Sequence, residues 1–394
     1  MQKSKGSVAP VKAAPSSGPP IPARTLRIPN IPPSVTEQDF RKYLGGILGY
    51  PDFMLSYVPD ETNITATITP TKGEPASLAR CIPGKEIDLP YPGTKHGLLV
   101  DCDFFGLTPL YTAKEPTVDI VVVTGLAGNA YGSWGSRSPP QMWVRDFLPS
   151  DLRERGCQVR ILTFGYDTAF RDKTITPTVQ IFGRWLMESL SRLRPEGNAS
   201  SRRPIIFMGH SLGGLVIKHA LADASRPESL KSEKAILSSS VGLFFFGVPN
   251  QGLDVQNFRT LVEDQKNARF IESLATGSES LRVIHDSFVR GVNVELKGCQ
   301  IFSFYEKKDT QAVVIKPDGT WSRTGNMIRL VTPESATVAF PSAQMQPQIG
   351  IDADHSNMVK FAGKNDPSYQ IVLAKTVDCV KNAQKIVDAR KRHA

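Results

Sequence analysis

The chain has 394 residues, of which 40% are hydrophobic and 22% charged, values that exclude a wholly disordered or fibrous protein. The net charge of +9 comes from the two ends, because residues 1–36 hold five basic and no acidic residues, and Lys375–Ala394 six basic and two acidic. Residues 37–374 are thus neutral, which argues against a basic groove for nucleic acid and leaves, for the ends, weak peripheral contact with an anionic membrane.

Residues 1–23 are rich in Ser, Pro and Ala, and we expect a disordered leader there. The segment has no apolar core of a secretory signal, although its basic, acid-free composition partly resembles an organellar transit peptide. Apolar runs such as Val241–Val248 reach only about half the roughly 18 residues of a membrane span. Five cysteines without metal-type spacing favour a reducing compartment. We expect an intracellular, cytoplasmic protein, with mitochondrial or membrane-peripheral locations as alternatives.

Residues 24–112 predict a small α+β module. A short strand in "LRIPNI" is followed by Thr36 as helix N-cap, and "ITATITP" at Ile64–Pro70 alternates as a half-buried strand does. The pattern resembles an RNA-recognition-type (RRM-like) βαβ fold, which stacks bases on aromatic side chains of its central strands. Neither strand segment has an aromatic residue. We therefore expect the module to dock a protein partner or to play a structural role, and we expect no nucleic acid.

Residues 113–376 predict a larger α/β domain. Val118–Val123 is a β-branched run of the kind buried on both faces of a parallel sheet, and strand-like and helix-like segments alternate after it. This alternation predicts a mostly parallel central sheet covered by helices on both faces. Residues 377–394 are expected to form a C-terminal helix and a basic tail.

The stretch "GHSLG", Gly209–Gly213, fits G-x-S-x-G and lies between a predicted strand and a predicted helix. In that context the pattern predicts a sharp turn that exposes the hydroxyl of Ser211 as a nucleophile. The Leu212 N–H at the helix start is a candidate donor to an oxyanion. The second backbone donor is expected in "TGLAGN" after the earlier buried strand, where Leu126 is the natural candidate.

A serine nucleophile needs a base and a carboxylate that orients it, here expected in the order Ser, Asp or Glu, His. Three histidines follow Ser211 with room for this order: His285, His355 and His393. His393 lies in the basic tail and His285 in a helical pattern, so the polar loop around His355 best fits the base. Glu306, at the end of the strand segment "CQIFSFYE", is the preferred acid. Asp254 and Asp309 remain alternative acids.

Seven segments together resemble the α/β-hydrolase, lipase-like family of serine-active-site-containing proteins of phospholipid remodelling and of fungal SesB-like domains. They are "TGLAGNAYGSW", "MWVRDFLP", "VRILTFGYD", "GHSLGGLVIKHAL", "GLFFFGVPNQG", "FSFYE" and "DADHSNMVKF". The resemblance covers roughly Val118–Ala374, implies Ser211, Glu306 and His355 as the triad, and supports Leu126 and Leu212 as donors. Two positions depart from the family: Thr124 replaces its usual His before Gly125, and "GVPN" replaces G-T-P-H. We expect the first departure to loosen the oxyanion loop, which is the segment that carries Leu126, and the second to loosen the rim of the active site.

The sequence thus predicts a serine esterase or lipase-like hydrolase without metal or cofactor. By resemblance, its substrate is a lipid or another hydrophobic carboxylic ester. The alternative is a catalytically weak α/β-hydrolase-like signalling or effector module that acts through protein partners. An intact triad favours the hydrolase, and Thr124 favours the signalling module.

Overall fold

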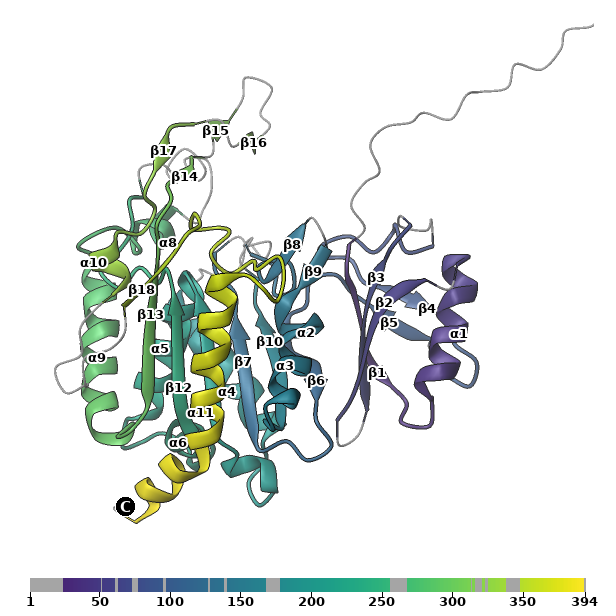
Figure 1. Cartoon of the computed structure of the whole chain (residues 1–394), viewed down its shortest axis with the longest axis horizontal. Helices are drawn as coiled ribbons and strands as arrows, with labels where there is room; N and C mark the ends of the chain where they lie inside the picture. Colours follow the sequence, from purple (N-terminus) through teal and green to yellow (C-terminus); the bar gives the residue numbers. More distant parts are fainter. Residues whose placement is uncertain are drawn as a thin grey trace, which may run out of the picture.

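The computed structural model describes residues 24–392 apart from positions 51, 61–62, 73–76, 95–96, 127, 138–139, 168–177, 256–267, 313, 316–320, 323–324 and 338–347. The expected leader 1–23 and His393 lie outside the described residues. Figure 1 shows a large sheet between helices, with a smaller sheet and the helix α1 beside it.

A seven-stranded sheet forms the centre, in the order β18-β13-β12-β11-β7-β10-β6. All neighbours pair in parallel except β6, which pairs with β10 in antiparallel fashion. In chain order the strands are β6 (Gly106–Thr112), β7 (Val118–Val123), β10 (Val159–Gly165), β11 (Ile205–His210), β12 (Ser240–Phe246), β13 (Gln300–Glu306) and β18 (Gln348–Ile351). The predicted mostly parallel α/β sheet is therefore present.

Helices cover both faces of this sheet. One core cluster joins the sheet to α4 (Val179–Leu193), α5 (Leu212–Ala224) and α9 (Glu279–Glu295). The other joins it to α2 (Trp143–Asp146), α3 (Leu148–Glu154) and α11 (Pro367–Lys391). Val121 and Val123 enter the first cluster, while Val118, Ile120 and Val122 enter the second. The β-branched run is thus buried on both faces, as its composition predicts.

Shorter elements complete the part of the molecule built around the seven-stranded sheet. They are β8 (Gly135–Arg137), β9 (Pro140–Met142), η1 (Ala199–Arg202), α6 (Lys231–Ser239), α8 (Ala268–Glu272) and α10 (Pro333–Ala336). The pairs β14 (Thr310–Gln311) with β17 (Met327–Ile328), and β15 (Val314–Ile315) with β16 (Trp321–Ser322), follow β13. Figure 1 shows these pairs beyond the end of β13. None of the helices within the described ranges has the length and apolarity to cross a membrane.

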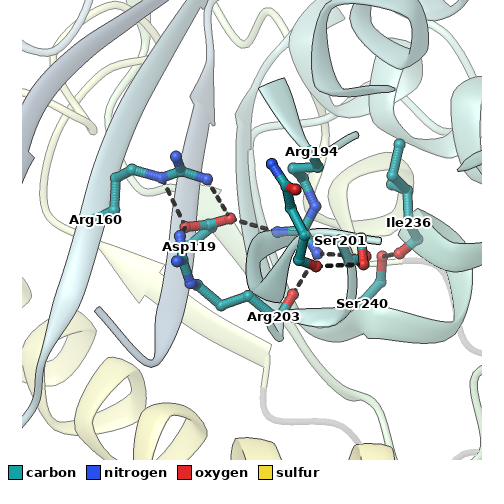
Figure 2. Close-up of polar contacts among 8 residues, drawn as sticks. Asp119, Arg160, Arg194, Ser201, Arg203, Ile236 and Ser240 are labelled. Atoms are coloured by element: carbon teal, nitrogen blue, oxygen red, sulfur yellow. Dashed lines mark hydrogen bonds and ion pairs between the residues drawn. The ribbon is translucent and has the colours of Figure 1, made fainter. Parts of the chain in front are cut away.

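Asp119 ties several elements together at the amino end of the sheet. Its carboxylate is fully buried in β7 and pairs with the guanidinium groups of Arg160 (2.8 Å), Arg203 (3.0 Å) and Arg194 (Figure 2). These arginines come from β10, from the segment before β11 and from the end of α4. Burial alone raises the pKa of Asp119, but the arginines outweigh it, so the pKa lies below its usual range.

The N-terminal sheet is antiparallel, with the order β1-β3-β2. Its elements are β1 (Leu26–Ile31), α1 (Glu37–Leu48), β2 (Phe53–Pro59) and β3 (Ile64–Pro70), followed by the pair β4 (Ile87–Leu89) and β5 (Leu98–Val100). Thr36 caps α1 through its hydroxyl, which accepts from the Asp39 N–H, as the sequence predicts. The module is thus α+β, and Arg27 of β1 pairs with Asp101 just after β5.

The strand β3 is buried on both faces, so the prediction of a half-buried strand is wrong. Its isoleucines join the core of the small sheet, and Thr65, Thr67 and Thr69 are buried as well. The Arg145 guanidinium of α2 lies 3.4 Å from the hydroxyls of both Thr67 and Thr69. Because the part of the molecule that holds α2 covers the threonine face of β3, these threonines are not available to a ligand.

Two predicted boundaries separate residues that the structure joins. Strand β6 lies before the boundary at 112/113, yet it pairs along its length with β10 and forms the edge of the large sheet. Helix α11 begins at Pro367 rather than near residue 377, with Asp366 as its N-cap. Arg390 near its end donates to the carbonyls of Lys297, Ser238 and Ser240, so part of the basic tail is bound to the rest of the protein.

Candidate active site

Ser211 occupies a sharp turn between β11 and α5. Its φ of 53° and ψ of −125° are a strained conformation for a residue with a side chain. Glycines make the turn possible: a Cβ at Gly209 would lie 2.6 Å from the Cα of Gly214, and one at Gly125 would lie 2.9 Å from the Cβ of Ser211. The turn therefore holds the serine at the carboxyl edge of the sheet, at the N-terminus of a helix.

His355 lies in the loop after β18 and faces Ser211. Its Nε2 is 3.0 Å from the Ser211 hydroxyl, and its backbone N–H donates to the Thr310 hydroxyl over 3.1 Å. His210 also fixes this residue, since its Nε2 lies 2.8 Å from the His355 carbonyl oxygen. Burial, and secondarily the neighbouring His355, lowers the pKa of His210 to about 3, so a neutral His210 donates this bond.

Glu306 is the carboxylate that meets His355. It ends β13, is fully buried, and its Oε2 lies 2.6 Å from Nδ1 of His355. The other oxygen, Oε1, accepts the Val331 N–H over 3.1 Å. Arg329 donates to the Glu306 carbonyl over 2.7 Å, which ties the end of the strand to the segment after β17. With Nδ1–H donating to Glu306, the Nε2 of His355 is free to accept the serine proton.

The alternative acids and the other histidine lie elsewhere. The carboxylate of Asp309 pairs with Arg329 at 2.7 Å, and Asp254 is exposed on the loop after β12. His285 lies within helix α9, as its pattern predicts. Glu306 is thus the acid that the fold places against His355.

The two expected oxyanion donors flank Ser211. Leu212 is the first residue of α5, so its N–H belongs to the unpaired first turn of a helix, where the dipole favours negative charge. Leu126 follows Gly125, the glycine in contact with Ser211, and packs partly buried against the core. Both backbone groups therefore belong to segments that touch the serine turn.

The two departures from the family pattern are well anchored here. Thr124 is buried, its hydroxyl lies 2.5 Å from that of Ser133, and its carbonyl accepts the Tyr166 hydroxyl over 2.8 Å. Asn250 of "GVPN" donates to the Ser335 carbonyl over 2.8 Å and accepts from the ammonium group of Lys218. Hydrogen bonds thus hold both segments in this protein.

Sequence reasoning did not identify the groups that hold the site. His210, Thr310, Val331 and Arg329 each bond a member of the Ser211–His355–Glu306 row through a backbone or side-chain atom. Backbone bonds of this kind leave no residue pattern, and the contacts join segments up to 145 positions apart. Only for His210 was there a signal, its place next to Ser211.

No family model matches the chain. Over 295 residues it is 27% identical to Protein SERAC1 of Bos taurus, and over 290 residues 24% identical to Protein SERAC1 of Homo sapiens; each match covers 68% of this chain and 40% of the relative. The chain thus spans about two fifths of the length of the curated relatives it matches.

Solved structures also resemble parts of the chain. Phospholipase PlaB from Legionella pneumophila in complex with thio-NAD has a TM-score of 0.46 and 12% identity, and covers 70% of this chain and 62% of its own. YbtT, a type II thioesterase from the yersiniabactin biosynthetic pathway, has a TM-score of 0.36 and 14% identity, and covers 71% and 99%. At such distances the function has to be argued from the geometry of the site itself.

Proposed function

We propose that the protein is a serine hydrolase that cleaves a carboxylic ester through Ser211, His355 and Glu306. The observation that carries this proposal is the hydrogen-bonded row from Ser211 Oγ to His355 Nε2 (3.0 Å) and from His355 Nδ1 to Glu306 (2.6 Å). A hydroxyl in contact with an imidazole that is itself oriented by a buried carboxylate is the arrangement that activates a serine nucleophile.

In this mechanism Ser211 Oγ attacks the acyl carbonyl while His355 accepts the hydroxyl proton. Glu306 holds the imidazole in the required tautomer and stabilises the imidazolium. His355 then gives the proton to the leaving alcohol, which leaves an acyl-enzyme. A water molecule, deprotonated by the same histidine, releases the acid and restores Ser211.

The backbone N–H groups of Leu126 and Leu212 are the proposed donors to the oxyanion. Loss of one such donor typically costs about 2.7 to 4 kcal/mol of transition-state stabilisation.

For the substrate we propose a lipid or another hydrophobic acyl ester, following the family resemblance. Met327, 60% exposed on β17, adds apolar surface to the strand pair that carries Thr310, the partner of the His355 N–H.

The test is labelling of the full chain with a fluorophosphonate probe. We expect Ser211 of the parent protein to be labelled, and labelling to fall by about 10⁴-fold or more in Ser211→Ala and His355→Ala. His285→Ala is the matched control, because this histidine lies in α9 beside Lys218, and it should label as the parent does. An unlabelled parent that is folded by circular dichroism would contradict the proposal. A labelled parent would next be tested on phospholipids and on p-nitrophenyl esters of different chain lengths.

A further inference from the structure

The loop after β7 touches the serine turn and carries one of the proposed oxyanion donors. A Cβ at Gly125 would lie 2.9 Å from Ser211 Cβ and 3.1 Å from the His210 carbonyl oxygen, so the loop has no room to move closer. An oxyanion donor works only within about 2.7 to 3.1 Å of the developing charge. Whatever fixes this loop therefore also fixes the geometry of the proposed oxyanion site.

Asn129 holds the far end of this loop with both ends of its amide. Its Oδ1 accepts the N–H groups of Tyr131 (2.9 Å) and Gly132 (3.0 Å), which closes the local turn. Its Nδ2 donates over 2.9 Å to the carbonyl of Cys102, 27 residues earlier in the chain. Asn129 thus connects the loop beside Ser211 to the segment that leaves the N-terminal module.

That segment is itself fixed by the N-terminal sheet. Asp101 pairs through Oδ2 with Nε of Arg27 in β1 (2.7 Å), and its Oδ1 accepts the Phe104 N–H (2.8 Å). Arg27 also donates through Nη1 to the Phe105 carbonyl (2.8 Å) and to the Thr108 hydroxyl (2.9 Å). One side chain of β1 therefore binds both sides of Cys102.

Phe104 shows how tightly this segment is held. It is buried and has a φ of 58°, a conformation that residues with a side chain rarely adopt. Its carbonyl oxygen lies where a Cβ of residue 165 would be, so the contact requires Gly165 at the end of β10. Its ring packs 5.7 Å from that of Tyr131, next to the Asn129 turn. Strain of this kind persists only where the surroundings fix the residue, which is common at functional sites.

We propose that Asn129 is a positioning residue for the oxyanion loop, and that the N-terminal sheet sets the place of this loop through Arg27, Asp101 and the Cys102 carbonyl. The proposal rests on the proposed function. It gives the small N-terminal module a role in positioning the proposed active site, rather than a separate role in binding a partner.

The test compares Asn129→Asp with the parent full chain. An aspartate keeps an oxygen for the Tyr131 and Gly132 N–H groups, but it replaces the Nδ2 donor with an oxygen that repels the Cys102 carbonyl. With p-nitrophenyl butyrate we expect kcat to fall about 10- to 100-fold, part of the 10²- to 10³-fold that loss of a whole donor costs. KM should stay within about twofold, since ground-state binding does not use the oxyanion donors. Labelling by the fluorophosphonate should slow in parallel with kcat.

Thr36→Ala is the matched control. It removes the N-cap of α1 and so destabilises the same module without touching the loop. It should lower Tm with kcat unchanged. Arg27→Lys tests the contact of the N-terminal sheet with the segment around Cys102. An ammonium group keeps the ion pair with Asp101, but it cannot also reproduce the two hydrogen bonds that Nη1 donates to Phe105 and Thr108. This substitution should lower kcat at constant KM.

The outcomes separate the two proposals. If the parent protein is active and Asn129→Asp and Arg27→Lys keep the parental kcat, as Thr36→Ala does, the positioning role is wrong while the hydrolase proposal stands. If Asn129→Asp fails to fold, Arg27→Lys alone decides, by a kcat loss or its absence. If the folded parent is neither labelled nor active, the hydrolase proposal fails and the positioning role fails with it.

Discussion

Lys218 places an ammonium group inside the molecule, seven residues after Ser211 on α5. The side chain is buried, its Nζ lies 5.4 Å from the ring centre of Phe245 and 5.3 Å from that of Phe288, and it donates to Asn250. Burial lowers its pKa to about 7. His285 on the neighbouring α9 shares this environment, and its pKa falls to about 4, first through burial and then through the charge of Lys218.

The lowered pKa of Lys218 predicts a pH dependence of stability. In the unfolded chain the lysine keeps its proton up to its ordinary pKa of 10.5, while the folded protein releases it near 7. The unfolded state therefore binds more protons between pH 7 and 10, and this group makes the free energy of unfolding rise there, by up to about 1.4 kcal/mol per pH unit. Lys218→Met should remove that part of the slope in urea titrations at several pH values. The exposed Lys385→Met should keep it, and equal slopes for all three proteins would show that the charge of Lys218 is not the cause.

For single residues, the sequence predicted Ser211, His355 and Glu306 from their order in the chain and from the strands, helices and loops expected around them. It left Asp254 and Asp309 open as acids, because all three carboxylates follow strand-like segments. The structure separates them by the partner that each carboxylate meets: Glu306 bonds His355, while Asp309 bonds Arg329. Which carboxylate meets a histidine 49 positions away depends on the packing of two loops, and no residue pattern encodes it.

Among the elements, β7, β10 and α4 depend on one buried carboxylate, Asp119. We predict that Asp119→Asn lowers the free energy of unfolding by about 3 to 5 kcal/mol, because three guanidinium groups lose their counter-charge and Arg194 is almost fully buried. Denaturation in urea at neutral pH measures this. The pair of Lys308 and Asp352 is the control, since both side chains are more than half exposed, and Asp352→Asn should leave the urea midpoint almost unchanged. An equally small effect of Asp119→Asn would contradict the prediction.

The lowered pKa of Asp119 also predicts how its contribution to stability changes in acid. The pKa of Asp119 is lower in the folded protein than in the unfolded chain, so its contribution is complete above the unfolded value. It is lost as pH falls through the lowered folded value. The difference in stability between the parent protein and Asp119→Asn should therefore shrink only below the usual range of aspartate.

The strongly periodic elements were predictable and the edge elements were not. The run Val118–Val123 and the helix after Ser211 follow from composition and from the glycine turn. The predicted boundary at 112/113 places strand β6 with the small module, yet its backbone partner is β10, about 50 residues later. Pairing of an edge strand is decided by a distant strand, so local sequence cannot assign it.

For the whole molecule, the two sheets share a buried polar contact. Arg145 of α2 reaches Thr67 and Thr69 of β3, and Arg27 of β1 reaches Thr108 of β6. We predict a single unfolding transition in calorimetry, since unfolding of either sheet would break these contacts with the other. Arg145→Leu, which leaves both hydroxyls without this donor, should separate the transition into two. Two transitions in the parent protein would show that the sheets unfold independently.

The sequence by itself determined the α/β class, the serine turn and the order of the proposed catalytic residues. These follow from local properties: β-branched runs, glycines around one serine, and polar residues after strands. The tertiary structure alone decided which carboxylate meets His355, how the threonine face of β3 is covered, and how Asn129 joins the serine side of the large sheet to the small one. Each of these depends on contacts between segments far apart in the chain, whose positions are set by the packing of the whole molecule.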